Sequence, residues 1–358
     1  MFTEFKKLFF QFRTGLNPIA RAENKFRSVF ILRALIVTSL ASEIVWAQVP
    51  GSDPSATGNV STAPTNRSAA RNTTPGRPRA NRAPAPPRNP VPILPALPAP
   101  NNTSFYASND VPHGRMEMVH YKSSAGVDKQ MHIYLPPGYD ADTDKHYPVL
   151  YLNHGGGEND THWSAHQRQG GYADLILDNL IASGKARAML IAMPNTGGVV
   201  SGTPTKLGED DPCTQEYLKD IIPYVDGHYR TRRNRESRAV AGLSMGGFVT
   251  LNTGLTHLET FGELYVFSSG YWPDQLPAFQ ENIKSLLGAT NINDKFRMPI
   301  YFAAGETDIA LFNSQKTLAV FNNYGVRNFW VLSSNGHEWL NWRRYLYQTA
   351  QIMFPDDR

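Results

Sequence analysis

Cysteine is almost absent from this chain of 358 residues, because Cys213 is the only one. A single thiol excludes an intramolecular disulfide and a cysteine-ligated metal site. Small secreted scaffolds need such cross-links, but a chain of this length with 41% hydrophobic residues can bury a sizeable core without them. Cys213 has no histidine nearby in the sequence, so we expect a structural or surface thiol rather than a nucleophile.

A concentrated basic region is missing from the part of the chain that should fold. The formal net charge is +4, but residues 1–104 carry 13 Lys and Arg against 4 Asp and Glu, whereas residues 105–358 carry 22 against 27. The positive excess therefore belongs to an N-terminal tail in which arginines are scattered between prolines. Nucleic-acid binding needs a basic patch on a folded surface, so we expect no nucleic-acid partner.

Long hydrophobic runs are scarce, and the run at residues 29–37 is too short to predict a membrane span. Lys25 and Arg27 precede this run, and Val45-Trp46-Ala47 follows it with suitable residues at the −3 and −1 positions of a cleavage site. The pattern predicts a signal peptide over residues 1–47 and a secreted or periplasmic protein without stable membrane insertion after cleavage. The alternative is an uncleaved membrane anchor.

Residues 48–104 contain little that could form a core. Pro, Ala, Asn, Arg, Ser and Thr dominate, and the proline-rich runs at 84–87 and 95–100 favour extended polyproline conformations. Apolar side chains are too sparse to offset the entropy lost on ordering. We therefore predict a disordered linker over residues 48–104, followed by a single folded domain over residues 105–358.

Strands and helices alternate from about residue 105 onward. Residues 116–122 and 129–135 alternate in polarity and predict an antiparallel start, and residues 148–153 form a continuous apolar strand of the kind buried within a sheet. Further strands are expected at 188–193, 238–241, 264–268, 299–304 and 329–332, and helices at 172–183, 213–229, 245–256, 314–324 and 337–353. This order predicts an α/β fold with a mostly parallel sheet covered on both faces, whose ligands bind at the carboxyl ends of the strands.

A nucleophile motif lies between an expected strand and an expected helix. Its residues are Gly242-Leu243-Ser244-Met245-Gly246, a G-x-S-x-G pattern. In this context the serine lies on a tight turn that lifts its hydroxyl above the sheet, and side chains at the two glycines would collide with neighbouring segments. The amino end of the following helix favours developing negative charge. Ser244 is therefore the candidate nucleophile, and a glycine-rich turn without catalysis is the alternative.

A serine nucleophile needs a base, and only two histidines follow Ser244. His257 belongs to the helix directly after the nucleophile and is too close in sequence to reach back. His337 stands in a loop between the last expected strand and the last helix, which is where the α/β-hydrolase fold delivers its histidine. His337 is therefore the candidate base.

The acid that orients the histidine should lie between Ser244 and His337 in the chain. Asp308 directly follows the apolar strand 299–304, and we choose it as the candidate acid. Glu306, two residues nearer the strand, is the rival. No apolar strand leads into Asp274 or Asp294, which makes them weaker candidates.

Two backbone N–H groups are needed to stabilise the oxyanion of acyl transfer. Met245, the residue after the nucleophile, should supply one of them. The other should come from the glycine loop Asn153-His154-Gly155-Gly156-Gly157, with Gly156 as the donor. Near these loops, Trp272, Trp163 and His154 are the candidate substrate contacts, ahead of the tryptophans that follow His337.

Several motifs of residues 105–358 resemble those of one enzyme group. They are Asp110-Val111-Pro112-His113-Gly114, Tyr134-Leu135-Pro136-Pro137-Gly138-Tyr139, His154-Gly155-Gly156-Gly157, Ile222-Pro223-Tyr224-Val225-Asp226, Tyr229-Arg230-Thr231, Ala241-Gly242-Leu243-Ser244-Met245-Gly246-Gly247, and Gly336-His337-Glu338-Trp339 with Trp342-Arg343. The chain resembles the bacterial feruloyl esterase and acetyl xylan esterase group of the esterase D-like α/β-hydrolases. By this resemblance, Ser244, Asp308 and His337 take the triad positions.

The resemblance implies a secreted serine carboxylic ester hydrolase that cleaves feruloyl or acetyl esters of carbohydrate. Its partner would be a small-molecule or oligosaccharide ester, and the mechanism implies no metal ion and no organic cofactor. Siderophore esterases look similar at the same motifs, and an acyltransferase that passes the acyl group to a sugar hydroxyl would use the same machinery. A non-catalytic carbohydrate-binding protein with this fold is a third alternative.

Overall fold

The computed structural model describes residues 91–196 and 211–355. The predicted signal peptide and most of the predicted linker lie outside these ranges. Within them, no helix has both the length and the apolar composition of a membrane span.

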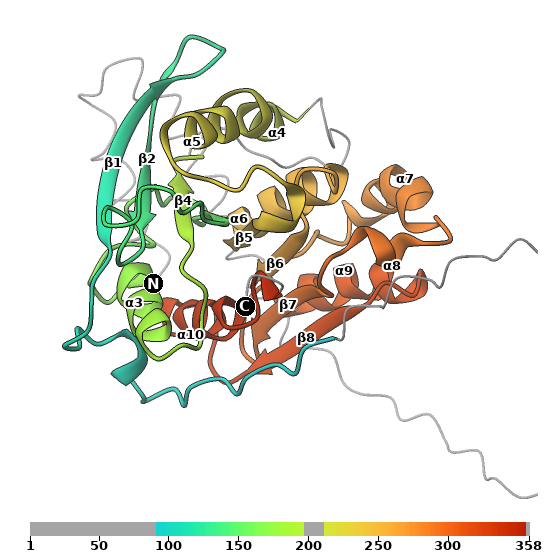
Figure 1. The fold of residues 1–358 in the computed structure, drawn as a ribbon. Helices are drawn as coiled ribbons and strands as arrows, with labels where there is room; N and C mark the ends of the chain where they lie inside the picture. The colour runs from blue at the N-terminus through green and yellow to red at the C-terminus, as the bar shows by residue number, and fades with distance from the viewer. Residues whose placement is uncertain (1–90, 197–210, 356–358) are drawn as a thin grey trace, which may run out of the picture. The chain divides into compact units, whose positions relative to one another are not determined.

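Eight strands of the described residues form one sheet in the order β1-β2-β4-β3-β5-β6-β7-β8 (Figure 1). β1 (Arg115–Lys122) pairs antiparallel with β2 (Asp128–Leu135), which pairs antiparallel with β4 (Leu190–Pro194). All other neighbouring strands are parallel. The predicted α/β fold with an antiparallel start is therefore confirmed.

The central strands are buried along their whole length, which explains their continuous apolar sequences. They are β3 (Val149–Asn153), β4, β5 (Arg238–Leu243), β6 (Glu263–Phe267) and β7 (Ile300–Gly305), while β8 (Asn328–Ser333) forms the partly exposed edge. The sheet separates two hydrophobic cores, one on each face, and alternate side chains of β3 pack into each. Val149 and Tyr151 pack into one core, and Leu150 and Leu152 pack into the other.

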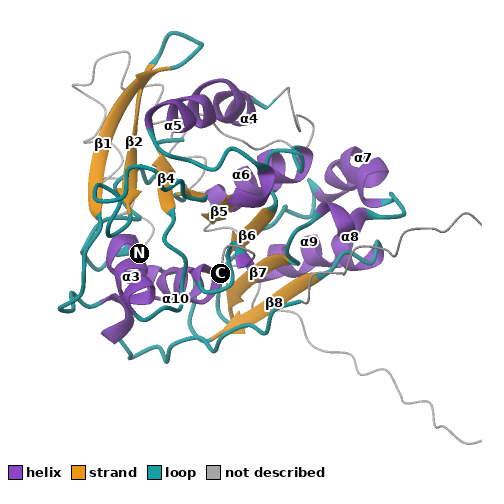
Figure 2. Cartoon of the chain, in the orientation of Figure 1, coloured by secondary structure: helices purple, strands orange, loops and turns teal. Residues whose placement is uncertain are grey.

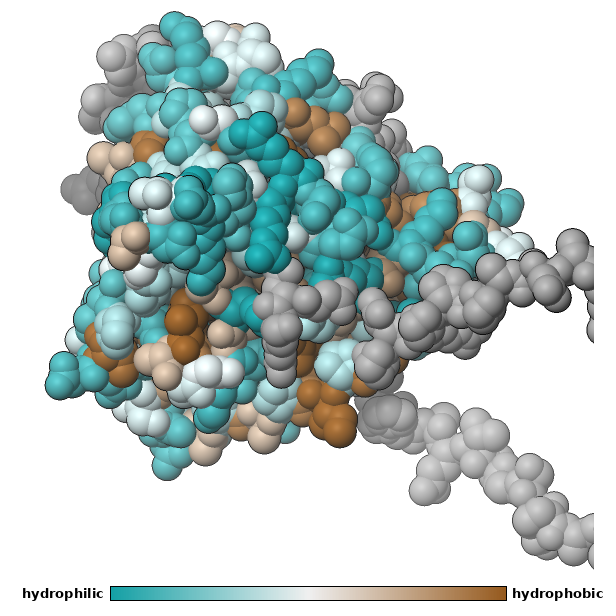
Figure 3. Space-filling view, in the orientation of Figure 1, coloured by the Kyte–Doolittle hydropathy of each residue, from teal (hydrophilic) through white to brown (hydrophobic). Residues whose placement is uncertain are grey.

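Helices cover both faces of the sheet (Figure 2). One face carries α3 (Ala173–Ala182) and α10 (Trp339–Ala350). The other carries α4 (Pro212–Glu216), α5 (Ile222–His228), α6 (Met245–Val249), α7 (Leu276–Leu287), α8 (Ile292–Lys295) and α9 (Leu311–Asn323). Figure 3 shows hydrophilic residues over much of one side of the described surface, with hydrophobic residues in smaller groups between them.

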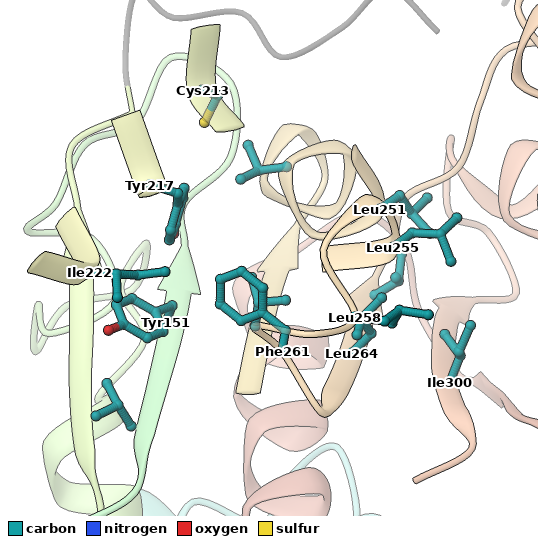
Figure 4. Close-up of a cluster of buried hydrophobic side chains, with 14 of the residues drawn as sticks. Tyr151, Cys213, Tyr217, Ile222, Leu251, Leu255, Leu258, Phe261, Leu264 and Ile300 are labelled. Atoms are coloured by element: carbon teal, nitrogen blue, oxygen red, sulfur yellow. The ribbon is translucent and has the colours of Figure 1, made fainter. Parts of the chain in front are cut away.

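The core on the face that carries α4 to α9 contains the single cysteine. Tyr151 of β3 meets Tyr217 and Phe261 at ring-centroid distances of 5.8 and 5.9 Å, and Cys213 lies in the same cluster (Figure 4). The Cys213 thiol is fully buried, and this burial raises its pKa well above the ordinary value. Cys213 is therefore a structural thiol, one of the two roles that we expected.

Two features of the helices were not predicted. The expected helices 213–229 and 245–256 each contain a π-helical turn, at Tyr217–Ile221 and Thr250–Gly254. Helices α7 and α8 were missed altogether. The buried residues Phe279, Ile283 and Leu287 recur every four positions along α7, which is a helical period that the sequence did contain.

The predicted boundary at residue 105 is wrong, because residues 91–104 already pack on the domain. Leu94 and Leu97 contact the core beneath α10. Gln348 Nε2 donates to the carbonyl of Pro95 at 2.5 Å, and Arg344 Nε donates to that of Pro98 at 2.7 Å. An extended proline-rich chain leaves its own carbonyls unpaired, and α10 supplies the donors. Composition favoured disorder because it could not reveal these distant partners.

Candidate active site

Ser244 occupies a strained turn between β5 and α6. Its backbone has φ 51° and ψ −115°, a positive φ that is uncommon for a residue with a side chain. Its N–H donates to Phe267 O of the neighbouring strand β6 at 2.9 Å, which holds the turn against the sheet. A Cβ at Gly242 would lie 2.2 Å from Gly246 O, so the turn requires a glycine there.

His337 and Asp308 are joined by a hydrogen bond at the carboxyl edge of the sheet. Asp308 follows β7 and His337 follows β8, and these strands are parallel neighbours. His337 Nδ1 lies 2.8 Å from Asp308 Oδ1. The Asp308 side chain is fully buried, whereas the His337 ring is 20% exposed. A carboxylate that accepts from Nδ1–H leaves Nε2 as the basic nitrogen.

The surroundings of Asp308 keep its carboxyl group ionised. Burial has the largest influence and by itself raises the pKa, but the hydrogen bond to His337 and the charge of that ring oppose it. The Ala310 N–H donates a further hydrogen bond to Oδ1 at 2.8 Å. The net result is a pKa of Asp308 below its ordinary value. The rival acid Glu306 is exposed and has no side-chain hydrogen bond within the ranges that the structure describes.

Ser268 and Trp342 support the histidine, and sequence reasoning missed Ser268. Trp342 meets the His337 ring edge to face, and its indole Nε1 donates to Ser268 Oγ at 2.9 Å. Ser268 follows β6 and, like Ser244, has a positive φ, of 47°. Its position directly after a buried strand was a signal that could have found it. Residues that follow β5, β6, β7 and β8 therefore line one edge of the sheet.

The glycine loop lies against Met245, the residue that follows the candidate nucleophile. β3 and β5 are parallel neighbours, so the loop after β3 adjoins the Ser244 turn. A Cβ at Gly156 would lie 3.1 Å from Met245 Cε. Gly155 N–H already donates to Glu158 Oε2 at 2.8 Å, whereas Gly156 N–H has no hydrogen-bond partner among the described residues. Met245 begins α6, and first-turn amides lack an acceptor within their own helix.

The three predicted substrate contacts lie in different environments. Trp272 follows the end of β6 and is 45% exposed, so its ring is accessible to a ligand. Trp163 is instead 1% exposed, packs edge to face on Trp339, and donates from Nε1 to Asn153 O. His154 is also buried, its Nδ1–H donates to Gly155 O at 2.8 Å, and burial lowers its pKa. The last two side chains therefore support the glycine loop from inside the core.

A cavity of about 660 Å³ opens beside the candidate base. Its lining includes Gly157, His162, Arg168, His337 and Trp342. These side chains offer hydrogen-bond donors and aromatic surface to a polar ligand. Among the described residues, no three His, Cys, Asp or Glu side chains are grouped as metal ligands.

Comparison with known proteins gives consistent similarities. A family model described as "Putative esterase" matches residues 123–350. The chain is 30% identical over 266 residues to an endo-1,4-beta-xylanase/feruloyl esterase of Xylanibacter ruminicola, covering 72% of this chain and 34% of that protein. It is 27% identical over 271 residues to endo-1,4-beta-xylanase Y of Acetivibrio thermocellus, covering 68% and 23%. The chain thus spans about a third or less of the length of these relatives.

A solved structure extends this likeness to three dimensions. A ferulic acid esterase superposes with a TM-score of 0.58 at 26% identity, covering 67% of this chain and 98% of that chain. The resemblance that the sequence motifs indicated is confirmed by these matches.

Proposed function

This chain belongs to the esterase family, and from that membership we propose that it is a secreted serine carboxylic ester hydrolase acting on feruloyl- or acetyl-type esters of carbohydrate. The observation that carries the proposal is the 2.8 Å hydrogen bond between Asp308 and His337 at the sheet edge to which the Ser244 turn also belongs. A serine, an oriented histidine and a buried carboxylate are the groups that nucleophilic acyl transfer requires.

The proposed reaction has two halves. Ser244 Oγ attacks the ester carbonyl while His337 Nε2 takes its proton, and a C–O bond forms. The tetrahedral intermediate collapses, the bond to the alcohol breaks, and the alcohol leaves with the proton from His337. Water then attacks the acyl-enzyme by the same steps and releases the acid. Asp308 holds the imidazole tautomer and stabilises the imidazolium.

Two backbone amides are proposed to bind the oxyanion, from Gly156 and Met245. Support comes from the contact of Gly156 with the Met245 side chain, and from the Gly156 N–H, which has no hydrogen-bond partner among the described residues. The exposed ring of Trp272 suits an aromatic or apolar acyl group. The cavity beside His337 suits a sugar alcohol, because His162 and Arg168 in its lining can hydrogen-bond to hydroxyl groups.

Turnover of methyl ferulate and of p-nitrophenyl acetate tests the proposal. Wild-type protein should release acid from at least one of them. Ser244→Ala and His337→Ala should each reduce turnover on the order of 10⁴- to 10⁶-fold, and the double variant should be little worse, because the two residues act as one unit. Activity that survives in Ser244→Ala would refute the mechanism. Acyl-sugar formed in the presence of a sugar acceptor would identify a transferase instead.

Export is a separate part of the proposal. Cleavage after Ala47 should leave a mature chain that begins near Gln48, which intact-mass analysis of protein from the periplasm or medium can measure. A mass that still includes residues 1–47 would contradict it.

A further inference from the structure

A carboxylate outside the proposed triad lies between its oxyanion loop and its histidine. Glu158 Oε2 accepts from Gly155 N–H at 2.8 Å, and Glu158 Oε1 accepts from Trp339 Nε1 at 3.0 Å. Gly155 precedes the proposed oxyanion donor Gly156, and Trp339 follows two residues after His337. One side chain therefore connects two parts of the proposed site that are 181 residues apart in sequence.

We propose that Glu158 is a positioning residue that fixes the oxyanion loop to the start of α10, and that the link requires its ionised carboxylate. The inference rests on the proposed function. By holding the Gly155 amide, Glu158 sets the course of the loop so that the next amide, that of Gly156, stays free beside Met245. Oxyanion donors act only when they are already aimed at the charge that develops.

The chemistry of the two partners explains why a carboxylate is needed. Both Gly155 N–H and Trp339 Nε1–H are donors, and an ionised carboxylate offers an acceptor oxygen to each. A glutamine has one acceptor and one NH₂ group, so it would set a donor against one of the two donors. A protonated glutamate would do the same with its O–H.

The negative charge of Glu158 does not stabilise the folded state. Burial is the largest influence and raises the pKa of Glu158 above its ordinary value, although the Gly155 amide, the Trp339 indole and the charges of His162 and His337 oppose this. A carboxyl group with a raised pKa favours the folded state below its ordinary pKa, and this contribution is lost as pH rises through the folded value. Ionisation of Glu158 therefore costs the folded protein stability instead of adding to it.

Four variants separate positioning from a structural role: Glu158→Gln, Trp339→Phe, the double variant, and Glu259→Gln as a control that removes an exposed carboxylate outside the proposed site. Glu158→Gln should lower kcat about 10- to 100-fold with little change in KM or Tm, since a misaimed oxyanion loop acts in the transition state. Trp339→Phe removes one donor and should lower kcat about 3- to 10-fold, because one of the two hydrogen bonds is lost.

The double variant gives the decisive comparison. With Phe at position 339, the glutamine oxygen can accept from Gly155 and its NH₂ no longer faces a donor. The kcat of the double variant should therefore rise above that of Glu158→Gln, to about the level of Trp339→Phe, instead of falling to the product of the two effects. A wild-type kcat in Glu158→Gln, or independent effects in the double variant, would overturn the inference.

The test remains informative in two less simple cases. If Glu158→Gln does not fold, Trp339→Phe alone decides, and an unchanged kcat in that variant overturns the link. If wild-type protein has no activity that depends on Ser244, the proposed function fails. If wild-type activity is normal and Glu158→Gln leaves it unchanged, only the role proposed for Glu158 fails.

Discussion

The imidazole of His337 and the indole of Trp342 meet edge to face, with ring centroids 5.0 Å apart and an interplanar angle of 88°. The indole is itself fixed, because its Nε1 donates to the buried Ser268 Oγ at the end of β6. The histidine is thus held on one side by Asp308 and supported on another by a tryptophan tied to the neighbouring strand.

Trp342→Phe tests this support. The variant keeps an aromatic ring near His337 but loses the hydrogen bond to Ser268. We expect kcat for ester hydrolysis to fall about 3- to 20-fold, since a small misplacement of a base is costly. Trp330→Phe is the matched control, because Trp330 packs on the opposite face of the sheet. Steady-state kinetics should find its kcat within about twofold of wild type, a margin that corresponds to about 0.4 kcal/mol. Equal losses in both variants would argue against a specific role for Trp342.

Asp308→Asn and Glu306→Gln distinguish the two acids that the sequence offered. Asp308→Asn keeps the side-chain shape but favours the wrong imidazole tautomer, so kcat should fall on the order of 10³- to 10⁴-fold. Glu306→Gln should cost less than about tenfold, or about 1.4 kcal/mol. The kcat values of both variants are measured with the same substrate under the same conditions. An inactive Glu306 variant beside a nearly normal Asp308 variant would reverse the assignment.

The pH dependence of stability gives an independent test of the Asp308 environment. Its pKa lies below the ordinary 3.8, so its charge stabilises the folded state above that pH. This contribution is lost as pH falls through the lowered folded value. The free energy of unfolding of wild type should therefore exceed that of Asp308→Asn at neutral pH, and the difference should shrink below pH 3.8. Urea titrations at several pH values measure it, and a difference that grows in acid would contradict the lowered pKa.

The segment at residues 91–104 should contribute measurably to stability. A chain that begins at residue 105 loses the carbonyl acceptors of Arg344 and Gln348 and the packing of Leu94 and Leu97. Compared with a chain that begins at residue 91, we expect a loss of about 2–4 kcal/mol, from two hydrogen bonds and two partly buried side chains. Denaturant unfolding of both chains measures this loss. Equal stability would mean that the contacts contribute nothing.

Local sequence determined most of the elements that position the site. Buried strands carry continuous apolar runs. The G-x-S-x-G motif has a glycine at position 242 because a side chain there would collide with Gly246, only four residues away. Chain order and strand ends placed Ser244, Asp308 and His337 at one edge, because the carboxyl ends of parallel strands meet there. Each of these inferences depends on neighbours along the chain or on a general rule of the fold.

Tertiary structure alone decided which distant side chains meet. The sequence does not reveal that Glu158 accepts from Trp339, that Trp163 packs inward on the same indole, or that α10 supplies donors to Pro95 and Pro98. Hydrogen bonding and burial depend on groups brought together from segments far apart in the chain, and composition or periodicity carries no record of such partners. For that reason residues 91–104 read as a linker in the sequence and are part of the folded domain in the structure.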